Sequence, residues 1–268
     1  MLVLLLSAAL GHAPVHETLS RLDNTELGDA RRSAHLHLHQ GQPEAALAVL
    51  HPTDDSTQAL LLRAEAAVQL GRIEAHGQLA EVIRVGEPAD QARALELRAD
   101  FDPTRAWHDV AHAVLLVPTA ERALRAAALS PSPAAALAML AHARGELGAS
   151  VVLDQALAKA WIDVGEPLRA LPMLEGPTGQ TTEGRLLQAH ALDLAGQPHE
   201  GRALRSELLA DLDRRLQARD SPLLHLSRAR CLLALDRPQD ARAVLDHVIQ
   251  VAPDLAAARA LLASLEPV

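Results

Sequence analysis

Aromatic residues and cysteine are nearly absent from the sequence. Its 268 residues include no tyrosine, one phenylalanine, two tryptophans and one cysteine. Sandwiches and barrels of β-strands use many aromatic side chains, so this composition argues against both. Cys231 has no second cysteine with which to form an intrachain disulfide. Its place on an apolar helix face predicts a small core residue rather than a nucleophile.

Motifs for nucleotide binding and covalent catalysis are also missing from the sequence. No GxSxG nucleophile motif occurs, and the glycines stand singly at expected helix ends rather than in a phosphate-binding loop. Adjacent acids such as Asp54 and Asp55 lie in expected turns, where acids are typical helix caps. We therefore expect no catalytic residue, no cofactor and no enzymatic activity.

Positive charge is scarce as well. The net charge is −9 and no run of basic residues occurs, whereas a nucleic-acid-binding protein would show a basic face. We therefore do not expect DNA or RNA as a partner. No stretch is long and apolar enough to cross a bilayer, so no membrane span is expected either.

A short apolar run opens the chain. Leu2 to Leu10 precede Gly11-His12-Ala13, a small-x-small sequence typical of signal-peptide cleavage. No basic residue comes before the run, and Pro14 would follow the cut. We interpret residues 1–13 as a signal peptide, which predicts a periplasmic or secreted protein. The alternative, a buried N-terminal helix or a misplaced start codon, predicts a cytoplasmic one.

The abundant residues favour helices. Hydrophobic residues make up 49% of the chain, and most are alanine, leucine and valine, which suit close helix packing. Residues 223–253 predict two amphipathic helices around the turn Asp236-Arg237-Pro238, because proline suits the first position of a helix. Ala241 and Leu245 lie four residues apart and share one face. The alanine permits close approach of a neighbouring helix, and the leucine fills the space beside it.

The corner of this unit recurs along the chain. In six of seven copies a small residue follows three positions after the corner, and in most copies a large apolar residue follows four positions later. The predicted corners, in steps of 30, 30, 30, 34, 31 and 40 residues, are Pro43, Ile73, Pro103, Pro133, Pro167, Pro198 and Pro238. The exceptions are His76 at the small position and Arg205 at the apolar one. Such in-phase recurrence indicates tandem helical repeats.

This unit resembles the tetratricopeptide repeat, whose period is near 34 residues. Pro118 and Pro253 close their copies as in that family, and Trp161 stands four residues before the Gly165 turn, where the family usually has an aromatic. The sequence departs from the family in its lack of tyrosine and in steps nearer 30. The resemblance implies an all-α, right-handed α-solenoid of about seven helix-turn-helix repeats. It also implies that the protein binds peptides or other proteins.

We expect one such domain over residues 14–268. Its repeats are predicted near 27–55, 56–86, 87–118, 119–149, 150–179, 180–220 and 221–253, followed by a closing helix at 254–266. We favour packing of this helix on the seventh repeat over packing on another subunit. A separate short helix at 15–22, a cap at Asp102 and a hinge loop at 176–179 are also predicted. A long helix at about 198–218 accounts for the 40-residue step.

The resemblance also implies a partner-binding trough lined by the first helix of each repeat. Its lining residues would stand six positions before each turn glycine or its stand-in, and one turn further on. The predicted partner-binding residues are Glu65, Gln69, Lys159, Asp163, His190 and Arg230. Leu194 shares this lining, and Leu61, Leu186 and Leu226 would add apolar surface one turn earlier. This mixture suits an amphipathic helix or an extended peptide.

Fourteen histidines raise the alternative of a metal-binding enzyme accessory. Histidines four apart can chelate one ion from a helix face, and such pairs occur at His12/His16, His35/His39 and His108/His112. The stretch from His108 to His112 has Asp109 in place of the glutamate of the zincin motif, and no third ligand is evident. We therefore predict no metal site. The other alternative is a self-associating structural protein, and we favour a protein- or peptide-binding scaffold.

Overall fold

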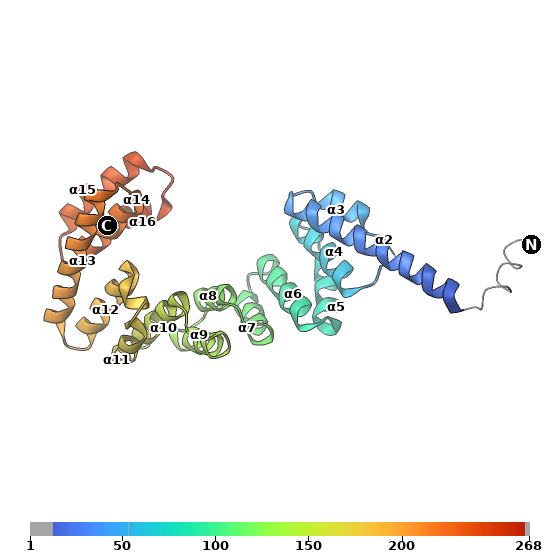
Figure 1. Cartoon of the computed structure of the whole chain (residues 1–268), viewed down its shortest axis with the longest axis horizontal. Helices are drawn as coiled ribbons and strands as arrows, with labels where there is room; N and C mark the ends of the chain where they lie inside the picture. The colour runs from blue at the N-terminus through green and yellow to red at the C-terminus, as the bar shows by residue number, and fades with distance from the viewer. Residues whose placement is uncertain (1–12, 53, 266–268) are drawn as a thin grey trace, which may run out of the picture. The chain divides into compact units, whose positions relative to one another are not determined.

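The computed structural model describes residues 13–52 and 54–265, and the side chains of residues 26–52 and 54–265. All regular structure in these residues is helical, with fifteen α-helices, two short 3-10 helices and no strand (Figure 1). The prediction of an all-α protein is thus confirmed. Within the described residues, no helix combines the length and the apolar character that crossing a bilayer requires. The proposed signal peptide at residues 1–13 falls almost wholly outside the described part.

The chain divides into two compact units, Met1–Leu129 and Ser130–Val268, called here the N-terminal and C-terminal units. The helices of the N-terminal unit are α2 (Ala13–His39), α3 (Pro43–Val49), α4 (Thr57–Gln69), α5 (Ala75–Val85), α6 (Pro88–Phe101), α7 (Ala106–Leu116) and α8 (Ala120–Leu129). Residues 15–39 were expected to form two helices, but α2 runs through them without a break.

The C-terminal unit continues the series of helices. They are α9 (Pro133–Leu147), α10 (Val151–Asp163), α11 (Pro167–Ala170) with the 3-10 turn η1 (Leu171–Leu174), η2 (Thr178–Gln180), α12 (Thr182–Leu194), α13 (Pro198–Ala218), α14 (Pro222–Ala234), α15 (Pro238–Val251) and α16 (Ala256–Ala263). The long helix predicted at 198–218 is confirmed. So is the packing of the closing helix α16 on α15, since Ala258 lies in the same core cluster as Leu245.

Five of the corners share one turn geometry. Two residues after the last residue of each turn-forming helix stands a residue with left-handed φ: Gly41 (69°), Gly71 (65°), Gly165 (84°), Gly196 (83°) and Asp236 (60°). In each, the next amide donates to the carbonyl five residues back at 2.8–2.9 Å, for example Arg237 N to Leu232 O. This is the Schellman motif, which glycine favours because it has no Cβ. Asp236 therefore takes the place of a glycine, as predicted.

Four of the predicted prolines follow such a turn directly. Pro43, Pro167, Pro198 and Pro238 each begin a helix as its first residue. The small residue three positions after each proline is buried, whether it is alanine or, after Pro198, glycine. The residue four positions further on is also buried; it is leucine in three copies and Arg205 in the fourth. The corner pattern is therefore correct for these four copies.

Ile73 is not an equivalent corner. Its side chain is 77% exposed, and His76 and Ala80, which the spacing placed in the core, are exposed too. The buried pair is Ala75 and Leu79, both 0% exposed. Ala75 stands four residues after the left-handed Gly71, whereas Ala46 stands five after Gly41, so the small-then-leucine pattern is intact but shifted by one residue.

Two further details differ from expectation. Asp102 does not cap a helix: it accepts hydrogen bonds from the amide and hydroxyl of Thr104, and α7 begins only at Ala106. The predicted hinge at 176–179 is partly packed, because Thr178 and Gly179 are buried and η2 forms there. By contrast, Ser132 does cap a helix: its Oγ accepts a hydrogen bond from the amide of Ala135 at the start of α9.

Packing is local along the chain. Each helix contacts its sequence neighbours within its unit, and α2 with α4, α4 with α6, and α10 with α12 also contact directly. The cores are small clusters of alanine and leucine, such as Ala64, Ala75, Leu79 and Val82 between α4 and α5. Cys231 belongs to one of these clusters and is 0% exposed, which confirms its prediction as a core residue.

Candidate partner-binding face

The predicted lining residues stand at equivalent positions of their helices. Glu65, Lys159, His190 and Arg230 each lie six residues before a left-handed turn residue with the same hydrogen-bonding pattern. The matching turns give these side chains the same place relative to the helix end. Side-chain exposure is 64% for Lys159 and 45% for Arg230, but only 19% for Glu65. His190 is exposed.

In the N-terminal unit, polar pairs connect successive first helices. Glu65 on α4 accepts a hydrogen bond from Arg93 on α6 at 2.7 Å. Glu96 on α6 receives two from Arg122 on α8, at 2.8 and 3.2 Å. Gln69 is exposed one turn beyond Glu65. The Glu65 carboxylate is thus already occupied by a neighbouring helix, which makes it a joint between helices as well as a surface group.

Asp54 makes a similar joint between α2 and α4. Its carboxylate lies 3.1 Å from Arg31 Nε, accepts from the Ser56 amide at 3.2 Å, and is only 5% exposed. Burial opposes ionisation, but the hydrogen bonds from Ser56 and the charges of Arg31 and Arg63 outweigh it and hold the pKa of Asp54 below its ordinary value. Ser56 in turn caps α4 through the amide of Ala59.

In the C-terminal unit, the predicted residues form pairs that are more exposed to solvent. Lys159 and Asp163 meet on α10 at 2.5 Å, and both are well exposed. Arg230 on α14 lies 3.3 Å from Glu183 on α12. The structure therefore links Arg230 to the helix that carries His190, and α10 contacts α12 directly.

The apolar part of the face differs from the prediction. Leu226 is 6% exposed and belongs to the core, while Leu61 and Leu186 are partly buried against core clusters. Leu194, which the sequence also placed in the lining, is 54% exposed, and Leu223, which it did not, is 64% exposed. Leu223 precedes Arg230 by seven residues and so shares its helix face. That spacing was visible in the sequence and could have identified it.

The histidine pairs that the sequence singled out have different outcomes. His35 and His39 lie on one face of α2, with their Nε2 atoms 3.3 Å apart. His108 and His112 are both exposed on α7. His12 and the side chain of His16 lie outside the described residues.

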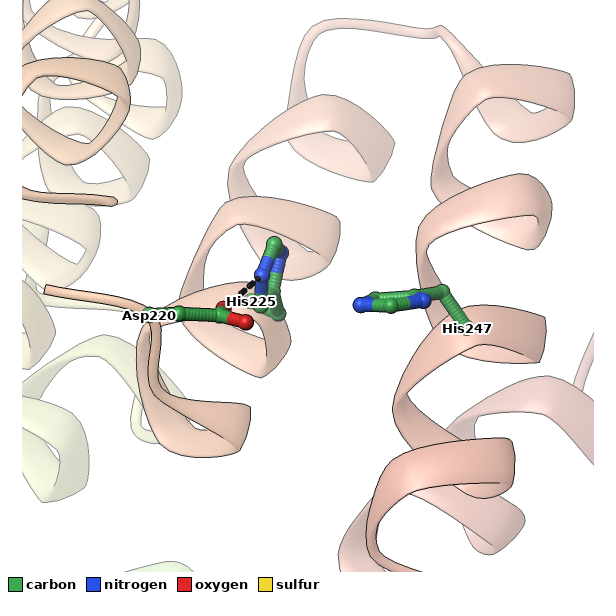
Figure 2. Close-up of side chains that lie close together, drawn as sticks. All are labelled: Asp220, His225 and His247. Atoms are coloured by element: carbon green, nitrogen blue, oxygen red, sulfur yellow. Dashed lines mark hydrogen bonds and ion pairs between the residues drawn. The ribbon is translucent and has the colours of Figure 1, made fainter. Parts of the chain in front are cut away.

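One polar cluster was missed by the sequence analysis. Asp220, His225 and His247 place one ligand atom each within 4.8 Å of the others (Figure 2). His225 and His247 are 22 residues apart on different helices, so no helical spacing rule joins them. Their proximity depends on the packing of α14 against α15.

Comparison with known proteins adds no relative: no family model matches the chain, and no curated protein matches it.

Proposed function

We propose that this protein is a non-catalytic scaffold that binds a protein or peptide on the first-helix face of a tetratricopeptide-like α-solenoid. The observation that supports this most directly is the exposure of Lys159, His190 and Arg230 at equivalent positions of α10, α12 and α14. Regular presentation of exposed polar groups on successive hairpins is the arrangement that repeat proteins use for extended ligands.

The chemistry of this face favours an amphipathic ligand. Leu194 and Leu223 offer exposed apolar surface, and burying a leucine side chain contributes about 1.5–3 kcal/mol. The pairs Lys159–Asp163 and Arg230–Glu183 are exposed, and surface pairs of this kind contribute about 0–1 kcal/mol. A carboxylate or an ammonium group of the ligand can therefore take the place of one member of a pair at little cost in free energy. The positions of these charges then fix the direction in which the ligand lies along the face.

The same proposal places the protein outside the cytoplasm. The support is the apolar run from Leu2 to Leu10 and the small-x-small sequence that ends at Ala13. Intact-mass measurement of the protein from its native host tests this step. A mature chain that begins near Pro14 supports export, and a chain that retains residues 1–13 contradicts it.

Site-specific photo-crosslinking tests the binding face. A photoreactive amino acid is introduced in place of His190, or in place of Arg242 on α15 as a control at another exposed position. Extracts of the native host are irradiated with each protein. The expected result is a discrete crosslinked product at position 190 that is absent at position 242.

Charge reversal then tests which residues matter. The double variant K159E/R230E is compared with R202E/R242E, which changes the net charge equally at exposed positions of α13 and α15. We expect the first to weaken the crosslink at position 190 at least about tenfold, or about 1.4 kcal/mol, and the second to leave it unchanged. Equal crosslinking at 190 and 242, or no effect of K159E/R230E, contradicts the proposal. A crosslink to a second copy of the chain supports self-association instead.

A further inference from the structure

Three side chains with metal-binding chemistry meet beside α14 and α15 (Figure 2). Asp220 comes from the turn after α13, His225 from the first turn of α14, and His247 from α15. His225 Nε2 lies 2.7 Å from Asp220 Oδ1. The rings of His225 and His247 meet edge to face, with centroids 5.2 Å apart. All three residues thus aim polar atoms into one small space.

The helix core holds the two histidines in place. Leu226, next to His225, is buried together with Leu245 and Val248, which flank His247 on α15. Because one apolar cluster joins both helices, the backbone positions of the histidines do not depend on a ligand. Asp220 is 75% exposed in a turn, so its carboxylate is free to adjust.

We propose that Asp220, His225 and His247 bind a divalent transition-metal ion of the zinc type. Two imidazole nitrogens and one carboxylate oxygen form an open three-ligand set, which leaves the fourth tetrahedral position to water or to a ligand atom. With bonds of about 2.0–2.2 Å, ligand atoms of such a site lie roughly 3.4 Å apart. The present spacing of up to 4.8 Å closes by rotation of the exposed side chains of Asp220 and His247.

The donor set decides the class of ion. Calcium and magnesium prefer six or more oxygen ligands, and a single carboxylate does not meet that need. Imidazole nitrogen suits zinc, cobalt, nickel and copper. The site is therefore directed at nitrogen-preferring ions, of which zinc and cobalt are convenient probes.

Charged neighbours do not oppose the ion. Arg228, Arg237 and Asp240 line the same open depression as the two histidines. Arg228 is paired with Asp213 at 2.6 Å and Arg237 with Asp240 at 2.7 Å. Each guanidinium thus has a carboxylate at hydrogen-bonding distance, and Asp220 adds one negative charge in direct contact with the ion.

Titration of the full chain with metal tests the site, independently of the partner-binding proposal. The protein is purified without a histidine tag, treated with a chelator, and titrated with zinc chloride by calorimetry and with cobalt(II) by visible absorption. We expect one tight equivalent, and cobalt bands typical of four-coordinate nitrogen and oxygen ligation.

Three variants locate the binding. H247A removes an exposed ligand and is expected to weaken zinc binding at least about tenfold. Loss of a residue that only hydrogen-bonds to a metal ligand already has an effect of about this size. D220N keeps a hydrogen-bonding group beside His225 but removes the charged ligand, and it is expected to weaken binding similarly. H35A/H39A removes the other close histidine pair and is expected to leave the tight equivalent intact. Circular dichroism of metal-free H247A and wild-type protein checks that the fold is the same.

The contrary results are equally definite. The proposal is wrong if wild-type protein binds no zinc equivalent, if H247A binds zinc as tightly as wild type, or if the tight equivalent disappears in H35A/H39A.

Discussion

The ion pair between Arg205 and Asp193 is the least well satisfied of the paired charges in the C-terminal unit. Arg205 on α13 occupies the position where most copies have leucine, and it donates from Nη2 to Asp193 Oδ2 on α12 at 2.7 Å. Asp193 Oδ1 and Arg205 Nε are buried without a hydrogen-bond partner among the described residues. Side-chain exposure is 10% for Arg205 and 29% for Asp193. We therefore expect that replacing both residues by apolar ones is nearly neutral.

The single variants are expected to cost more than the double variant. D193A leaves a buried guanidinium unpaired, which costs about 2–3 kcal/mol, somewhat less than the loss for a fully buried pair. R205L leaves a carboxylate that water reaches, and costs about 1 kcal/mol. D193A/R205L restores the leucine found at Leu245 and removes both unsatisfied atoms, so it should lie within about 1 kcal/mol of wild type. The coupling energy is then about 2–4 kcal/mol, at the upper end of the range for residues in contact.

Urea denaturation followed by tryptophan fluorescence measures these values. Trp161 lies in the C-terminal unit and Trp107 in the N-terminal unit, so a W107F background reports the unit that contains the pair. A double variant destabilised by as much as the two single variants together would refute the argument, because it would mean that the two charges contribute independently.

A better satisfied pair provides the comparison. Arg98 donates to both oxygens of Asp109, each at 2.7 Å, and Asp109 is 2% exposed. The hydrogen bond from Arg98 to Asp109 raises the pKa of the Arg98 guanidinium. R98L/D109A is measured in a W161F background. It is expected to lose clearly more stability than D193A/R205L does in the W107F background, because it removes two good hydrogen bonds and no unsatisfied atom.

Four further outcomes follow from single residues. Gly184→Ala should destabilise by about 1–3 kcal/mol in urea denaturation, because its Cβ would approach the carbonyl oxygen of Thr178 to 1.9 Å; unchanged stability contradicts this. Asp236→Gly should stabilise by about 0.5–1 kcal/mol, since it relieves a left-handed conformation, and a lower thermal midpoint would argue against it. Burial raises the pKa of the Cys231 thiol to about 11, so native protein near pH 8 holds about 100-fold less thiolate there than an exposed thiol does; iodoacetamide should label it at the rate of unfolding, and fast labelling of folded protein refutes this. The pKa of Asp54 is lowered, so the extra stability of wild type over D54N should be complete well above pH 4 and shrink as pH falls through that lowered pKa; a difference that grows on acidification would have the wrong sign.

Corner chemistry made most of the helices predictable. Proline at a helix start and glycine at a helix end act locally, so α13 and α15 begin where Pro198 and Pro238 indicated. The second pair failed because no proline marks its corner. We took Ile73 as the equivalent of the corner proline, which placed the expected buried positions one residue too far along the chain. The small-then-leucine pattern is present there at Ala75 and Leu79.

The contacts of the candidate face were less predictable. Counting back from Gly165, Gly196 and Asp236 located Lys159, His190 and Arg230 at exposed positions, since exposure follows from helix phase. Their partners do not follow from it: Glu183 is 47 residues from Arg230 in sequence. Arg205 looked like a misfit for the same reason. Asp193 Oδ1 lies only 2.3 Å from where a Cβ on residue 201 would sit, and the same carboxylate pairs with Arg205, so the glycine at 201 and the arginine at 205 both accommodate one half-buried carboxylate on the preceding helix.

The neighbour-to-neighbour packing of the helices has a consequence for how such a chain changes over evolutionary time. Each helix finds its contacts within a short stretch of sequence, so loss or duplication of one hairpin disturbs only the joints on either side of it. Small variations in spacing, such as the missing residue before Ala75 or the two extra turns of α13, are absorbed where they occur. A protein built in this way tolerates a change in the length of one hairpin while the packing of the others is kept.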